Sequence, residues 1–207
     1  MGKIKIICTL GPASFSKSIL KLLAKEKVDV FRINLSHTNS DQIEKKIKYL
    51  KQNKIKNICI DTEGAQVRTT RVKKKILLKK SRIIKIGNEN SLSNKNIINL
   101  YPKFNYLSCK INTLIYVGFE NLIIKIIKKD KKNLYGRVIE QGYLESNKGV
   151  HFNKQLKLPA LTQKDQNAIK IAKKNGINFY AMSFVNFGND VKKMRKIIGS
   201  KTFLISK

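Results

Sequence analysis

The chain has 207 residues, is 42% hydrophobic and carries a formal net charge of +31. This length suits one ordinary domain or two small ones, and the hydrophobic fraction is sufficient for a packed core, which excludes global disorder. No apolar run approaches the roughly 20 residues that cross a bilayer, so we expect no membrane partner.

The positive charge raises the hypothesis of nucleic-acid binding, because clustered basic residues release counterions from phosphate backbones. Only six of the 44 basic residues are arginine, however, and the lysines are spread over almost the whole chain. Dedicated nucleic-acid surfaces favour the bidentate guanidinium and interleaved aromatic rings. We therefore expect a solvated lysine coat and no specific nucleic-acid partner. A basic polyanion-binding protein remains an alternative.

The cysteines and the first residues bear on location. Cys8, Cys59 and Cys109 are odd in number and form no CxxC pair, so we read them as reduced core residues and expect no zinc site. The chain runs from Met1 directly into a strand-like motif, which leaves no room for a signal peptide. These features predict a cytoplasmic protein.

The first 69 residues alternate strand and helix. After an apolar run at 6–10, residues 16–27 have the period of an amphipathic helix, and a strand over 28–35 follows. A second helix is predicted over 39–52, capped by Asn39, Ser40 or Asp41, and a third strand over 57–62. Such a βαβαβ order is typical of a parallel sheet covered by helices.

From residue 70 to 156 the pattern changes to short β-rich runs separated by polar turns. The runs lie at 75–78, 82–86, 114–117, 122–127 and 134–139, and residues 128–133 read as a hairpin connection. Connections within a βα unit usually have about 2–6 residues, so this segment is predicted to be an inserted domain.

Helical periodicity returns in residues 157–207. Thr162 and Asp165 form a capping-box-like start of a helix that ends at Gly176. A strand at 178–185, a helix near 190–198 and a strand at 202–206 follow. We therefore predict an α/β fold: a partial TIM-type (β/α) barrel, with a small all-β domain inserted after the third strand. The expected domains are 1–69, 70–156 and 157–207, the last truncated after about the fifth strand.

Polar residues gather where the second and third strands end. Alternate strand residues point the same way, so Arg32, Asn34 and Ser36 share one face. A cation beside neutral oxygens suits a phosphate with a companion metal ion, whereas the alternative is simple capping of the following helix. Asp61 and Thr62 close the third strand, where an Asp commonly supplies a hard oxygen ligand or caps a turn.

Five segments together resemble the N-terminal portion of pyruvate kinase. They are residues 6–14 (IICTLGPAS), 31–37 (FRINLSH), 58–64 (ICIDTEG), 181–185 (AMSFV) and 204–207 (LISK). The resemblance implies phosphoryl transfer from phosphoenolpyruvate to ADP, giving pyruvate and ATP, with Mg²⁺ and K⁺ as cofactors.

The resemblance also implies roles for individual residues. It makes Lys207 and Arg32 catalytic, with Arg32 and Ser183 binding substrate. The implied nucleotide-binding residues are Asn34, His37, Arg68 and Lys148. The implied potassium ligands are Asn34, Ser36, Asp61 and Thr62.

Other expectations concern departures from the family pattern. Glu63 stands where the family usually has Lys and adds negative charge near the phosphate site. The magnesium ligands implied by the family fall after Lys207 and are absent from this chain. We therefore expect no turnover from the chain alone, and a homo-oligomer or association with a complementary C-terminal half. The alternative function is that of an inactive remnant or a phosphate- or nucleotide-binding module of the same family.

Overall fold

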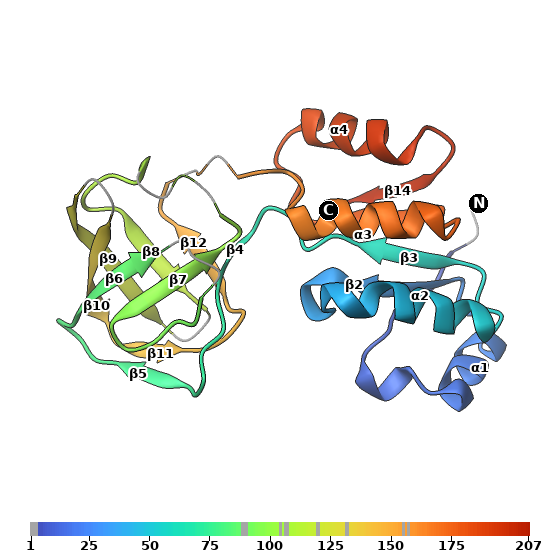
Figure 1. Cartoon of the computed structure of the whole chain (residues 1–207), viewed down its shortest axis with the longest axis horizontal. Coiled ribbons are helices and arrows are strands. Elements are labelled where there is room, and N and C mark those ends of the chain that lie inside the picture. Colours follow the sequence, from blue (N-terminus) through green and yellow to red (C-terminus); the bar gives the residue numbers. More distant parts are fainter. Residues whose placement is uncertain are drawn as a thin grey trace. The chain divides into compact units, whose positions relative to one another are not determined.

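Five short apolar runs pair side by side into a parallel sheet, seen in the blue, teal and orange-red parts of Figure 1. The computed structural model describes residues 4–87, 91–103, 105, 108–118, 121–130, 133–154, 156 and 158–207. The strands of this sheet are β1 (Ile7–Thr9), β2 (Val30–Asn34), β3 (Ile58–Asp61), β13 (Phe179–Met182) and β14 (Phe203–Ser206). The helices of this unit are α1 (Lys17–Lys25), α2 (Ile43–Gln52), α3 (Gln163–Lys174) and α4 (Gly188–Ile198).

The strands are ordered β1-β2-β3-β13-β14, and all neighbours are parallel. Strands β3 and β13 pair directly, with Phe179 opposite Cys59, although the whole β-rich segment separates them in sequence. The predicted α/β fold, with a β domain inserted after the third strand of a partial (β/α) barrel, is confirmed.

The period of two along each strand separates the two faces of the sheet. On β2, Phe31 and Ile33 are buried in the cluster that the helices share, together with Leu20, Ile47 and Ala168. On the opposite face Val30, Cys59 and Ala181 form a smaller apolar cluster. Since Arg32 and Asn34 alternate with the helix-facing residues, they lie on this second face, near the carboxyl ends of the strands.

The inserted segment closes into a seven-stranded barrel of mostly antiparallel strands in the order β10-β6-β7-β4-β12-β8-β9. Its strands are β4 (Val67–Thr69), β6 (Ile83–Gly87), β7 (Ile97–Tyr101), β8 (Leu114–Val117), β9 (Leu122–Lys129), β10 (Leu134–Glu140) and β12 (Gly149–Phe152). Two further strands, β5 (Ile76–Leu78) and β11 (Gly142–Leu144), pair with each other. Alternate residues such as Leu122, Ile124 and Ile126 fill the interior.

The chain divides into two compact units, residues 1–65 with 160–207, and residues 66–159. Strand β4 pairs with β7 and β12 and so is part of the barrel, although it precedes residue 70. Among the described residues, no helix is both long enough and apolar enough to cross a membrane.

Local predictions differ in outcome. The Thr162–Asp165 capping box of α3 is confirmed, but α2 begins after Gln42 without a side-chain cap, because a short 3₁₀ helix (Ser40–Gln42) leads into it. The strands on either side of the predicted 128–133 hairpin pair antiparallel, whereas residues 131 and 132 lie outside the described part of the chain. Strands β4, β7, β11 and β12 were not predicted.

Candidate active site

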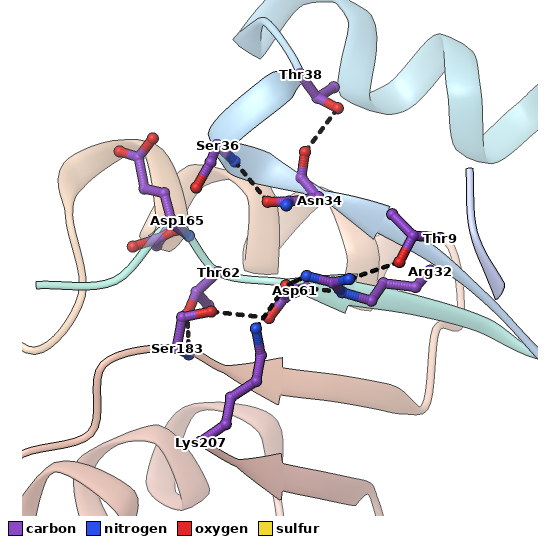
Figure 2. A network of polar contacts seen from close by, with 11 residues as sticks. Thr9, Arg32, Asn34, Ser36, Thr38, Asp61, Thr62, Asp165, Ser183 and Lys207 are labelled. Carbon is purple, nitrogen blue, oxygen red and sulfur yellow. Dashed lines mark hydrogen bonds and ion pairs between the residues drawn. The ribbon is translucent and has the colours of Figure 1, made fainter. Parts of the chain in front are cut away.

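Asp61 is the centre of a polar cluster at the carboxyl ends of the parallel strands (Figure 2). Its carboxylate is 1% exposed, and Oδ2 accepts a hydrogen bond of 2.8 Å from Nε of Arg32. The same oxygen lies 3.1 Å from Nζ of Lys207, and the Arg32 Nη2 group also pairs with it. Oδ1 accepts a bond of 3.0 Å from the hydroxyl of Ser183. Two cations therefore converge on one buried carboxylate.

Backbone pairing explains why these side chains meet. Arg32 precedes the end of β2, Asp61 ends β3, and Ser183 and Lys207 follow β13 and β14 directly. Parallel strands bring their carboxyl ends to one edge of the sheet, so residues far apart in sequence gather there. Thr9 of β1 completes the row, because its hydroxyl accepts a bond of 2.5 Å from Nη1 of Arg32.

Oxygen-bearing side chains lie beside the cluster on β2 and β3. Asn34 is opposite Asp61 in the parallel register, and its Oδ1 accepts a bond of 3.0 Å from the backbone N–H of Ser36. The hydroxyl of Thr62, which is fully buried, accepts from the backbone N–H of Ser183. A carboxylate and neutral oxygens are ligand types that could hold a hard cation.

A cavity of about 630 Å³ opens beside this edge of the sheet. Its lining includes Thr9, Pro12, Phe15, Asn34 and His37. His37 itself is exposed. The predicted residues Asn34 and His37 are therefore brought together at one cavity with both apolar and polar walls.

The start of α3 is fastened to the end of β3 by buried hydrogen bonds. Asp165 accepts from the backbone N–H of Glu63 at 2.8 Å and of Gly64 at 3.3 Å, besides capping its own helix through Thr162. Burial raises the pKa of the Asp165 carboxyl, and the backbone hydrogen bonds from Thr162 and Glu63 partly oppose this effect.

Glu63 differs from expectation in where its charge lies. Its carboxylate is buried, accepts a bond of 2.8 Å from the hydroxyl of Thr162, and lies 3.1 Å from Nζ of Lys164. The expected charge of Glu63 is thus paired with a lysine. Sequence reasoning missed Lys164, because its partner lies about a hundred residues away in the chain.

Arg68 and Lys148 belong to the barrel unit and are neighbours within it. Arg68 lies on β4 opposite Gly149 of β12, and its Nη1 donates to the backbone carbonyl of Asn147 at 3.3 Å. Lys148 pairs with Glu145 at 2.8 Å, with 40% of its side chain exposed. The other predicted site residues lie in the parallel-sheet unit, whereas these two lie in the barrel.

Thr9 is the other residue that the predictions missed, although it lies in the first of the five segments. The signal was available, since pairing of β1 with β2 in parallel sets Thr9 opposite Arg32. Helices cover one face of this parallel sheet, and polar and charged side chains gather at its carboxyl edge. This arrangement is that of the (β/α)-barrel class of proteins.

Comparison with known proteins identifies the family within this class. The family model described as "Pyruvate kinase, barrel domain" matches residues 1–206. The chain therefore belongs to the pyruvate kinase family. The pyruvate kinase of Staphylococcus aureus is 30% identical over 221 residues, which cover 100% of this chain and 37% of that protein. That of Staphylococcus epidermidis is 29% identical over 213 residues, covering 96% and 35%. The chain thus spans about a third of the length of these relatives.

Proposed function

We propose that this chain serves phosphoryl transfer from phosphoenolpyruvate to ADP. In this reaction a terminal phosphate oxygen of ADP bonds to the phosphorus and the phosphorus–oxygen bond to the enol breaks. The enolate that leaves then takes a proton at its methylene carbon, so that ATP and pyruvate result. The observation that carries the proposal is the convergence of Arg32 and Lys207 on Asp61 at the carboxyl edge of the sheet. Names of the relatives given above agree with it.

The two cations would have different tasks. Arg32 presents a planar guanidinium, which suits the bidentate recognition of a substrate phosphate. Lys207 would neutralise charge that develops on the transferring phosphoryl group and on the enolate oxygen. Asp61 would orient both groups before substrate binds, so that little reorganisation is needed during the reaction. Ser183, held by its bond to Asp61, would contact the substrate from β13.

A potassium ion would bind to Asn34, Ser36, Asp61 and Thr62, whose oxygens suit a hard monovalent ion. The ion would add fixed positive charge beside the substrate phosphate. The family resemblance also implies Mg²⁺, with ligands beyond residue 207. Within the described residues, no group of three or more His, Cys, Asp and Glu side chains could hold a metal ion together.

For ADP we propose the cavity lined by Asn34 and His37, whose apolar wall of Pro12 and Phe15 suits a nucleotide base. Arg68 and Lys148 remain proposed contacts of the nucleotide phosphates. We further propose that the protein acts in the cytoplasm as a homo-oligomer or together with a complementary C-terminal half.

Calorimetric titration of the 207-residue chain with phosphoenolpyruvate, in KCl with MgCl₂, tests the proposal. We expect binding that Arg32→Leu weakens about tenfold or more, because a charge-assisted bidentate contact is lost. Arg137→Leu is the matched control, since Arg137 is exposed on β10 of the barrel. Equal affinities of wild type and Arg32→Leu would contradict the proposed substrate site.

A coupled assay for pyruvate formation separates the two readings of this family member. Turnover after addition of a C-terminal half from a relative supports the enzyme. Binding of phosphoenolpyruvate or nucleotide that never leads to turnover supports a binding module. A third outcome, nucleic-acid binding with a steep salt dependence that phosphoenolpyruvate does not affect, would support the polyanion reading.

A further inference from the structure

Lys164 connects three segments that carry the candidate site. Its Nζ donates to the backbone carbonyl of Leu35 at 2.6 Å and to the carboxylate of Glu63 at 3.1 Å. Lys164 itself lies in the first turn of α3. Its two partners precede it by 129 and 101 positions in sequence, so only the folded sheet edge brings them together.

The attachment points flank the candidate potassium ligands. Leu35 lies between Asn34 and Ser36, and its carbonyl also accepts from the backbone N–H of Thr38. Glu63 follows Asp61 and Thr62 directly. By contacting both the Leu35 carbonyl and the Glu63 carboxylate, Lys164 therefore links two pairs of candidate ligands. Asn34 and Ser36 lie at the end of β2, and Asp61 and Thr62 lie at the end of β3.

The bridge is largely withdrawn from water. The side chain of Lys164 is 19% exposed and that of Glu63 is 7% exposed. Glu63 is held a second time by the Thr162 hydroxyl, which caps α3. At this depth, ion pairs are less screened than at the surface, and removal of one partner leaves a charge without compensation.

Helix stability does not explain a lysine at this position. The start of a helix carries partial positive charge, so a cation in the first turn is unfavourable. The capping box of Thr162 and Asp165 already satisfies the first backbone donors of α3. The charge of Lys164 is therefore unfavourable for the helix itself. Its contacts with Leu35 and Glu63 offset this cost.

We propose that Lys164 is a positioning residue that holds the Asn34–Ser36 segment against Asp61 and Thr62, and so sets the affinity of the site for K⁺. The inference rests on the proposed cation site and adds to it a residue outside the ligand set. In metal sites generally, residues that hold the ligands in place without binding the metal themselves are important for affinity. Their loss lowers metal affinity although every ligand remains.

The test measures the thermal unfolding midpoint of the 207-residue chain as KCl replaces tetramethylammonium chloride at constant ionic strength. A cation that binds only the folded state raises the midpoint with a concentration dependence that reports its dissociation constant. In Lys164→Met we expect the K⁺ concentration for half of the effect to rise about tenfold. Lys164→Arg should restore part of the affinity, because it keeps the charge and the donors.

Two further variants make the result decisive. Lys48→Met removes the lysine of an exposed pair with Glu44, so it should leave the K⁺ dependence unchanged. Glu63→Gln breaks the ion pair while an amide oxygen can still accept from Thr162, so it should shift the K⁺ dependence even if Lys164→Met does not fold.

Failure of this inference is distinct from failure of the cation site. If wild type shows no K⁺-specific stabilisation, the proposed cation site is wrong, and the positioning role falls with it. If wild type responds and both Lys164→Met and Glu63→Gln respond at the same K⁺ concentration, the cation site stands and the positioning role is wrong. A lower unfolding midpoint alone would mark Lys164 as purely structural.

Discussion

The ammonium nitrogen of Lys207 lies 3.1 Å from Oδ2 of Asp61, a residue 146 positions earlier in the chain. That oxygen also accepts from Nε of Arg32 at 2.8 Å. A single buried carboxylate therefore holds two cations close together. An incoming phosphate would meet a pair of positive groups whose mutual repulsion is already offset.

Asp61→Asn should lower the free energy of unfolding by about 2 kcal/mol. The change leaves two cations without their shared anion, but Arg32 and Lys207 have side chains 24% and 45% exposed, so solvent screening reduces the cost. Urea denaturation measures the effect. Inorganic phosphate should stabilise the variant more than wild type, because the anion replaces the lost carboxylate.

Glu44→Gln serves as the control for this prediction. Glu44 pairs with Lys48 on the exposed surface of α2, with side chains 40% and 61% exposed. Its loss should leave stability almost unchanged, because exposed ion pairs contribute little. If Asp61→Asn is no more destabilising than Glu44→Gln, the cluster does not hold the strand ends together.

Thr162→Ala should destabilise the protein by about 2 kcal/mol, at the upper end for a lost helix cap. Besides capping α3, the hydroxyl donates to the buried carboxylate of Glu63, which would lose a partner. Ser16→Ala removes the cap of α1, an exposed bond of 3.3 Å from the backbone N–H of Ile19, together with an exposed hydrogen bond to the Ser18 hydroxyl, and should cost less. Chemical denaturation of both variants gives the comparison, and equal costs would contradict the added role of Thr162.

Gly64→Ala should cost about 3 kcal/mol or more, through backbone strain combined with a steric clash. Gly64 has φ +71°, and a Cβ there would stand 2.3 Å from the backbone carbonyl oxygen of Ser183. Gly176 has a similar φ of +65°, but a Cβ added there would meet no atom within 4 Å, so Gly176→Ala should cost only about 1–2 kcal/mol. The difference between the two unfolding free energies isolates the close approach between the segments that follow β3 and β13.

Cys59 should make stability fall at alkaline pH. Burial, and secondarily the negative charge of Asp61, raises the pKa of this thiol to about 12. An unfolded cysteine ionises near pH ~8.5, so its contribution is fully present below about that pH and is lost between roughly 8.5 and 12. The free energy of unfolding should fall there by up to about 1.4 kcal/mol per pH unit from this group. Denaturation at several pH values, compared with Cys59→Ala, measures the slope, and identical slopes would refute the assignment.

The three cysteines should also differ in reactivity with a thiol reagent at mildly alkaline pH. Cys8 is half-buried, whereas Cys59 and Cys109 are buried, and burial raises the pKa of both of these thiols. Since the thiolate is the reactive form, we expect one fast-reacting thiol in the native protein and three after denaturation. Loss of the fast reaction in Cys8→Ser would identify it, and rapid labelling of Cys59 in the native state would contradict the burial.

The sequence by itself determined the alternating strands and helices of the first unit. Each of those elements carries its own signal, such as the apolar stripe of Ile43, Ile47 and Leu50 on α2 or the capping box of Thr162 and Asp165. Arg32, Asn34 and Asp61 were predictable as neighbours, because parallel strands end at one edge. The family was also readable there, from five short segments in order.

Only the tertiary structure decided how the inserted seven-stranded barrel closes and which side chains support the candidate site from neighbouring elements. Strands β4 and β11 have three residues each, too few for a periodic pattern, and they exist because neighbouring strands supply their hydrogen-bond partners. Likewise, Lys164 is one lysine among many in sequence. Its contact with Leu35 and Glu63 arises only when β2, β3 and α3 meet, because side-chain pairing over such separations depends on the packed sheet and not on local periodicity.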